Sequence, residues 1–167
     1  MTENDDRIQT IEGRCACGTV AYRVTLPPLV VHCCHCRWCQ RETGSAFAIN
    51  AVVEHDRVSL LAGAPEVILI PTQSGRGQRI ARCPECRVAL WSNYADGGEA
   101  IRFVRCGTLS APDRLPPDIH IHTASKLPWV RLPVGVPAVR EFYVPKEVWP
   151  AASLARWRAA VASRPAS

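Results

Sequence analysis

Seven of the nine cysteines fall into three short clusters, and this spacing constrains the fold more than any other feature of the chain. The clusters are Cys15-Ala16-Cys17, Cys34-His35-Cys36-Arg37-Trp38-Cys39 and Cys83-Pro84-Glu85-Cys86. Cysteines two or three residues apart can direct their sulfurs to one ion, and such spacings are typical of zinc ligands. We therefore expect the chain to bind zinc.

Disulfides and buried free thiols are the two competing explanations for these cysteines. The chain begins Met1-Thr2-Glu3-Asn4, without the basic start or apolar core of a secretion signal. We therefore expect a cytoplasmic protein, in a reducing compartment where clustered cysteines are usually metal ligands or redox thiols. Free thiols are common in protein cores, but three clusters at ligand spacing favour metal binding.

The seven clustered cysteines can be divided between metal ions in more than one way. If the first and last clusters close one four-sulfur site, the middle cluster keeps three sulfurs and an open fourth position. Part of the middle cluster could instead pair with the last one as a zinc ribbon, although their separation exceeds the ~15–20 residues expected of a ribbon. A closed tetrahedral zinc is structural, whereas a zinc with three protein ligands can take part in chemistry.

Strand geometry predicts which side chains in the middle cluster share a face. In an extended segment residues i and i+2 point to the same side, so Cys34 and Cys36 can reach one ion. By the same parity Cys33 faces away, and we expect it to fill the core, with the role of a substitute ligand as the alternative. We also expect Cys106 to fill the core. His35 is expected at most to support the ligands rather than to bind the metal.

Short alternating segments separated by glycine and proline predict a mostly β fold. The predicted strands cover residues 19–25, 46–53, 58–61, 67–70, 88–91 and 101–104. A short helix is predicted at 38–43, and a C-terminal helix at 150–164 because Leu154, Trp157 and Val161 recur at helical spacing. The 167 residues suit one domain, and no apolar run approaches the ~20 residues of a membrane span.

The net charge of +5 arises from 20 basic and 15 acidic residues, and the basic residues are mostly arginines scattered along the chain. Arginine suits small anionic ligands as well as phosphate backbones. A nucleic-acid-binding protein would gather its arginines into one stripe with exposed aromatic residues between them. No such stripe is present in the sequence, so we do not expect nucleic acid as a partner.

The cysteine clusters belong to an ordered series of motifs that runs from about Glu12 to Trp129. The series comprises Gly13-x-Cys15-x-Cys17-Gly18, Cys34-His35-Cys36-x-x-Cys39-Gln40-Arg41-x-Thr43-Gly44-Ser45, Cys83-Pro84-x-Cys86, Gly107-Thr108-Leu109, and His120-Ile121 followed by Lys126 and Trp129. This series resembles the glutathione-dependent formaldehyde-activating enzyme family, which also contains centromere protein V. The resemblance implies a β-tent fold of curled antiparallel sheets, to which the chain adds its short C-terminal helix. We divide the chain into a tail at 1–8, a zinc-binding domain at 9–149 and a C-terminal helix and tail at 150–167.

The resemblance also implies how two zinc ions are held. The structural zinc would be bound by Cys15, Cys17, Cys83 and Cys86, and the second zinc by Cys34, Cys36 and Cys39, which would be the catalytic group. The implied partners are a small thiol such as glutathione and a small aldehyde. The implied activity is that of a carbon-sulfur lyase that forms or cleaves S-hydroxymethylglutathione.

Basic side chains near the open site are candidates for contacts with glutathione. Arg41, Lys126 and His120 stand at positions that resemble the family's, and Arg37 is a further candidate for a carboxylate. His120 and His122 alternate with isoleucines, so we expect both imidazoles on one strand face.

The expected role of the second zinc follows from its ligands. Three thiolates already overcompensate the metal charge, so delivery of a thiolate is a more natural role than Lewis acidity. The alternative function is that of a zinc-stabilised β domain that binds a protein or nucleic acid without catalysis.

Two arginines depart from the family's pattern around the last cluster. Arg82 replaces the aromatic residue that usually precedes this cluster, and Arg87 replaces the glycine that usually follows it. A turn of this type often needs a positive φ after its second cysteine, which costs a non-glycine residue about 1 kcal/mol.

Overall fold

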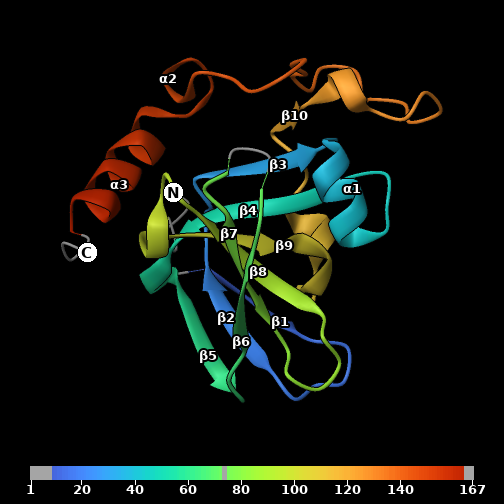
Figure 1. Ribbon diagram of the computed structural model, residues 1–167. Helices are drawn as coiled ribbons and strands as arrows, with labels where there is room; N and C mark the ends of the chain where they lie inside the picture. The colour runs from blue at the N-terminus through green and yellow to red at the C-terminus, as the bar shows by residue number, and fades with distance from the viewer. Residues whose placement is uncertain (1–8, 73–74, 164–167) are drawn as a thin grey trace, which may run out of the picture.

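A computed structural model describes residues 9–72 and 75–163 of the chain, and the predicted tail at 1–8 lies outside this part. The strands are β1 (Thr10–Arg14), β2 (Ala21–Thr25), β3 (Val30–Cys34), β4 (Ala48–Glu54), β5 (Val58–Ala62), β6 (Glu66–Ile70), β7 (Gln78–Arg82), β8 (Ala89–Tyr94), β9 (Ile101–Arg105) and β10 (Ile119–Ile121). The α-helices are α1 (Arg37–Thr43), α2 (Pro145–Val148) and α3 (Ala151–Ala162). The prediction of a mostly β fold with a short C-terminal helix is confirmed (Figure 1).

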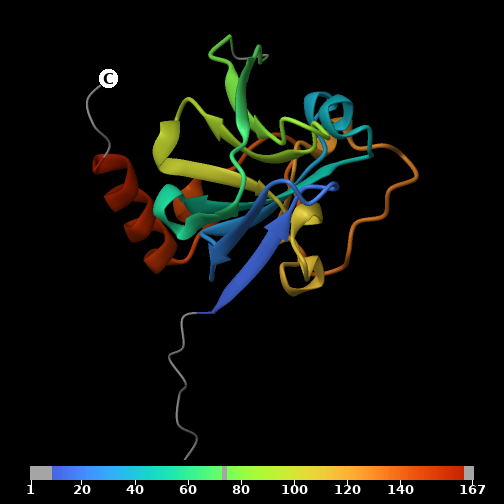
Figure 2. The same ribbon diagram turned by 90° about the horizontal axis from the view of Figure 1, so that it is seen from below.

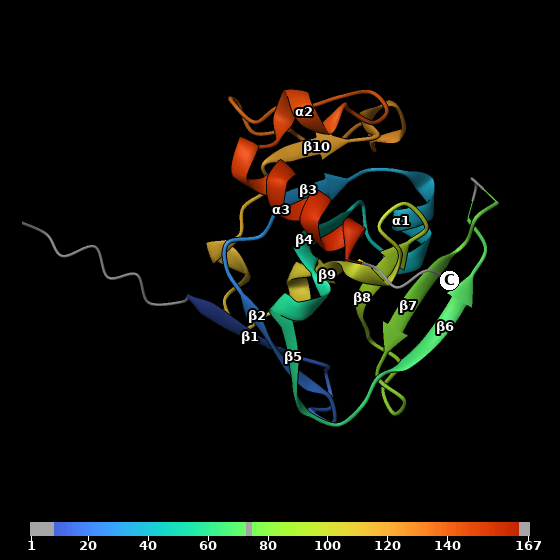
Figure 3. The ribbon, with the colours of Figure 1, turned by 90° about the vertical axis from the view of Figure 1, so that its left-hand side faces the viewer.

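The strands form two sheets. A three-stranded sheet has the order β1-β2-β5, and a seven-stranded sheet has the order β10-β3-β4-β9-β8-β7-β6. Figure 3 shows β1, β2 and β5 on one side of the molecule and β6, β7 and β8 on the other. Within the described residues the sheets do not close into a barrel, and β10 pairs in parallel with β3 whereas the other paired strands are antiparallel.

Strands β1, β3 and β7 do not coincide with predicted strands. All five residues of β3 are buried, because the strand lies between β4 and β10 and is covered on both faces. A strand of this kind lacks the alternation of polar and apolar residues by which a half-buried strand is recognised. β10 agrees with the strand expected from the alternation of histidines with isoleucines, but it ends at Ile121.

The core between the two sheets centres on Tyr22 of β2, which is fully buried. Its ring meets Trp91 of β8 edge-on, with the ring centroids 5.5 Å apart, and its hydroxyl lies 2.5 Å from the Thr108 hydroxyl. Gly13 of β1 leaves room for this ring, because a Cβ at that position would lie 2.4 Å from the tyrosine Cζ. Cys15 and Cys83, from two different cysteine clusters of the sequence, are buried together in this core.

Helix α3 docks on the outer face of the large sheet, against β4 and β9 (Figure 2). Trp157 and Val161 pack against the apolar cluster on that face, as their spacing predicts. Arg156 donates to both carboxylate oxygens of Glu54 at the end of β4, at 2.6 and 2.7 Å. Within the described residues no helix is both long and apolar enough to cross a bilayer.

The ion pair between α3 and β4 predicts the effect of removing its arginine. Arg156→Ala leaves the Glu54 carboxylate, whose side chain is 8% exposed, with Arg57 as its remaining ionic partner at 3.6 Å. We expect docking of α3 to weaken by about 1.5–3 kcal/mol, which hydrogen exchange of the amides in 151–162 would detect. The exposed Arg158 of the same helix is the control, and equal exchange in Arg156→Ala and Arg158→Ala would contradict the prediction.

Candidate metal centres and active site

From here on, Cys15, Cys17, Cys83 and Cys86 are called the first cluster, and Cys34, Cys36 and Cys39 the second cluster. The first cluster joins the two sheets. Cys15 and Cys17 lie in the turn between β1 and β2, where the amide of Gly18, at φ +82°, donates to the Cys15 carbonyl at 3.2 Å. Cys83 and Cys86 lie in the turn between β7 and β8. The pair Cys15 and Cys17 therefore converges through a tight turn rather than through the alternation of an extended segment.

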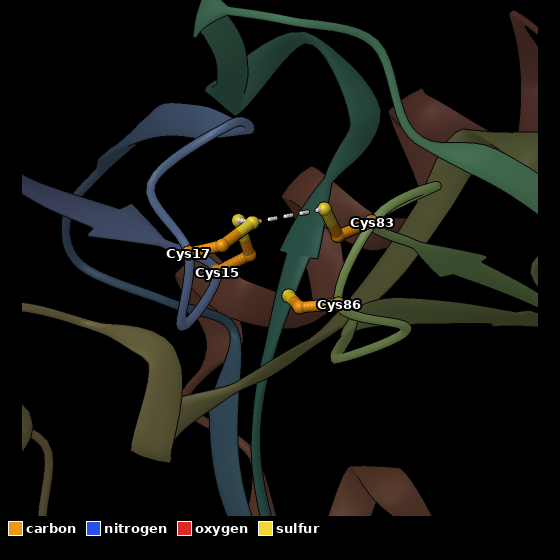
Figure 4. A group of neighbouring side chains, drawn as sticks. All are labelled: Cys15, Cys17, Cys83 and Cys86. Atoms are coloured by element: carbon orange, nitrogen blue, oxygen red, sulfur yellow. Dashed lines mark hydrogen bonds between the residues drawn. The ribbon is translucent and has the colours of Figure 1, made fainter.

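The sulfurs of this cluster are spaced as a zinc ion requires. All four lie within 4.8 Å of one another, with 3.5 Å between Cys15 and Cys17 and 3.7 Å between Cys17 and Cys83 (Figure 4). Zinc-sulfur bonds of about 2.3 Å in a tetrahedron place the sulfurs about 3.7 Å apart, so the donor set fits the metal.

Hydrogen-bond donors surround these sulfurs. The amide of Val20 donates to the Cys15 sulfur at 3.3 Å. The hydroxyl and the amide of Thr19 lower the pKa of Cys17 to about 6. The amide of Val88 is the main cause of the lowered pKa of Cys86. Such donors offset the excess negative charge of four thiolates around one divalent ion.

The two arginines that depart from the family pattern both have structural roles. Arg87 adopts φ +62°, which confirms the left-handed residue expected after the second cysteine of the turn. Its carbonyl accepts a hydrogen bond from Arg82 at 2.9 Å, and Arg82 also forms an ion pair with Glu42 of α1. Arg82 thus connects the turn of the first cluster to the helix that carries part of the second.

The second cluster is built by one continuous segment of chain. Cys34 ends β3, Cys36 is the N-cap of α1, and Cys39 lies in the first turn of that helix. The amide of Cys39 donates to the Cys36 sulfur at 3.3 Å, and the three sulfurs lie within 4.8 Å of one another. The thiols of Cys34 and Cys39 donate to Cys36 and lower its pKa to about 2, while the pKa of Cys34 is raised. The cluster thus offers three protein ligands to a metal.

A cavity of about 450 Å³ lies beside the second cluster, on the side that faces the first. It is lined by Glu42, Thr43, Phe47, Ala48, Ile49, Arg82, Val88, Ala89, Arg105 and Gly107. Glu42 and Thr43 belong to the helix of Cys39, and Ala48 pairs with Cys34 across the sheet. The cavity is therefore bordered by the elements that carry the three sulfurs, and none of Cys34, Cys36 and Cys39 is itself a lining residue.

Arg105 is a buried cation in the wall of this cavity. Its side chain is buried, and its guanidinium donates to Asn50 at 2.5 Å and to Ser92 at 3.2 Å. Its Nε has no hydrogen-bond partner among the residues that the structure describes. Sequence analysis did not single out Arg105, although it lies two residues before the Gly107-Thr108-Leu109 motif. Glu42 and Arg82 were likewise not assigned to the site.

The basic residues that were predicted to contact glutathione lie elsewhere. Arg41 is exposed on α1, and Arg37, also exposed, donates to Gln40 at 2.6 Å. Lys126 donates to two backbone carbonyls at 3.1 and 2.8 Å. His120 is buried, with its Nδ1 2.9 Å from the Nε2 of His35. None of these side chains lines the cavity.

The prediction that His120 and His122 share a strand face is wrong. β10 ends at Ile121, and His122 adopts the left-handed conformation with φ +55°. Its imidazole therefore leaves the strand plane and lies 3.5 Å from the carboxylate of Glu141.

Comparison with known proteins identifies the family of the chain. The sequence profile described as "Glutathione-dependent formaldehyde-activating enzyme" matches residues 10–125, most of the chain. The chain belongs to this family. A protein of Halomonas elongata that bears the same enzyme name is 27% identical over 128 residues, which cover 73% of this chain and 80% of that protein. A crystal structure of a Rhodobacter sphaeroides protein aligns with a TM-score of 0.47 and 21% identity, over 59% of this chain and 87% of that one.

The two clusters of this family member predict different outcomes of cysteine substitution. Cys83→Ser removes a potential metal ligand at the junction of the two sheets, and zinc binding worth about 10–16 kcal/mol in small domains is at least as large as much of the ~5–15 kcal/mol range of ordinary fold stability. We expect that variant to be insoluble or unfolded by circular dichroism. Cys36→Ser should remain folded with one zinc fewer per chain by elemental analysis. The reverse pattern would contradict the assignment of the first cluster as structural.

Proposed function

We propose that the chain is a zinc-dependent carbon-sulfur lyase that forms or cleaves the adduct of glutathione, or a related small thiol, with formaldehyde or another small aldehyde. The observation that carries this proposal is the three-sulfur cluster next to a cavity with two arginines. A zinc bound by Cys34, Cys36 and Cys39 would accept a thiol sulfur as its fourth ligand and keep it deprotonated. Family membership supports the choice of thiol and aldehyde.

The cavity has the size and charge that a small anionic thiol requires. Its volume of about 450 Å³ lies in the ~300–1,000 Å³ range of small-molecule sites. Glutathione carries two carboxylates and one ammonium group. Arg105 and Arg82 can bind carboxylates, and Glu42 can bind an ammonium group, all from the cavity wall.

Arg105 is also within electrostatic reach of Cys39. The pKa of the Cys39 thiol is raised, because the lowering by hydrogen bonding to Cys34 is outweighed by hydrogen bonding to Cys36 and by burial, and the positive charge of Arg105 acts against this rise. A carboxylate on Arg105 would therefore lie on the same side of the second cluster as Cys39. Arg41 stays a candidate for a second carboxylate at the exposed end of α1.

The sulfur cluster predicts a specific loss of activity. Cys39→Ala should abolish the rate of adduct formation above the uncatalysed background, with little change in the circular dichroism spectrum, because the helix is held by other contacts. Exchange NMR with glutathione and formaldehyde at equilibrium measures this excess rate. Cys106→Ala, which removes a buried thiol outside both clusters, is the control. An unchanged excess rate in Cys39→Ala would overturn the lyase proposal.

The two arginines of the cavity wall predict how their substitution changes the affinity for glutathione. Arg105→Gln removes a charge-assisted hydrogen bond worth about 1.5–3 kcal/mol, so glutathione should bind about 10- to 150-fold more weakly by calorimetry. Arg82→Gln should weaken binding in the same direction, and Arg158→Gln, on the distant face of α3, should not. If both cavity variants bind as tightly as Arg158→Gln, the thiol does not occupy this cavity.

A further inference from the structure

A third group of potential metal ligands lies on the opposite face of β3 from the second cluster. It consists of Cys33 of β3, His35 just after this strand, and His120 of β10. Strand pairing brings them together, because His120 is the register partner of Cys33 in the parallel pair. Their exposed fractions are 1%, 0% and 5%, so the group is enclosed by the protein.

The distances within this group are close to those of a zinc site. His35 Nε2 lies 2.9 Å from His120 Nδ1 and 3.6 Å from the Cys33 sulfur, and the three ligand atoms lie within 4.8 Å of one another. Zinc bonds of about 2.05 Å to nitrogen and 2.3 Å to sulfur give tetrahedral edges of about 3.3 Å and 3.6 Å. The nitrogen-sulfur edge matches, and the nitrogen pair needs to open by a few tenths of an ångström.

Hydrogen bonding within the protein leaves this group incompletely satisfied. The one contact between the rings uses one nitrogen of each imidazole. The others, His35 Nδ1 and His120 Nε2, have no hydrogen-bond partner among the described residues. Since each neutral ring carries one N–H, and the contact uses one of the two, either arrangement leaves a buried N–H unpaired. Zinc on His35 Nε2 and His120 Nδ1 would replace the contact between the rings and would keep the N–H on each outer nitrogen, so the metal would not pair these N–H groups.

The chemical state of the rings is compatible with coordination. Burial disfavours a charged imidazolium, and a neutral ring offers a lone pair to a metal. Two imidazoles and one thiolate would give a zinc complex with a net charge of +1, without the excess negative charge of the cysteine clusters.

We propose that Cys33, His35 and His120 form a third zinc site, distinct from the two cysteine clusters. The Cys33 thiol would lose its proton to solvent when the metal binds. Its role would be to fasten β10 to β3, because β10 is three residues long and one of its residues is a ligand. The turn after β10 also rests on His35, whose carbonyl accepts hydrogen bonds from Ser125 and Gln40. This proposal does not depend on the proposed lyase activity.

Metal counting on the intact chain tests the proposal. Full-length protein is saturated with zinc and freed of excess metal, and the number of ions per folded chain is measured by native mass spectrometry. The decisive pair is Cys33→Ala and Cys106→Ala, since both remove a buried thiol but Cys106 has no part in any group of ligands among the described residues. We expect Cys33→Ala to hold one zinc fewer than Cys106→Ala. Equal counts in the two variants would overturn the proposal.

A second pair of variants keeps the test decisive if Cys33→Ala fails to fold. His120→Gln should also lose one zinc, whereas the exposed His55→Gln should keep the full number. Hydrogen exchange adds a readout of position, because loss of this metal should speed exchange of the amides at 119–121 at least several-fold. Full metal content in His120→Gln, or unchanged exchange at 119–121 when one zinc is lost, would show that these residues do not form the site.

Discussion

The convergence of four sulfurs from two sheets is the constraint on which the rest of the structure depends. Cys15 and Cys17 follow β1 of the small sheet, and Cys83 and Cys86 follow β7 of the large one. Four thiolates this close would repel one another strongly, so the ionised cluster would need a cation between them. A metal bound here would therefore crosslink residues far apart in sequence, at the edge of the core that contains Tyr22 and Trp91.

The position of the candidate active site follows from this crosslink. The turn that holds Cys83 and Cys86 is connected through Arg82 to Glu42 on α1, the helix that carries Cys39. The cavity lies between these elements and is bounded by both turn and helix. A metal bound by the first cluster would thus support one wall of this cavity.

Each face of strand β3 carries a cysteine of a different ligand group. Cys34 lies on the side of the apolar cluster beneath α3, whereas Cys33 lies on the side of His35 and His120. Neighbouring residues of one strand can therefore belong to different ligand groups, because alternate side chains of an extended segment point in opposite directions. The burial of both faces makes this separation possible.

The sequence by itself determined the ligand chemistry and the class of fold. Cysteine spacing predicted three ligand-bearing segments, alternation predicted a mostly β fold, and helical spacing predicted α3, because each of these signals is local. Only the tertiary structure decided which distant segments meet. The approach of Arg105 to the cavity, the pairing of Arg82 with Glu42 and the grouping of Cys33 with His120 all depend on strand order and register. Local periodicity carries no information on strand order, so no reading of single segments could have placed these side chains together.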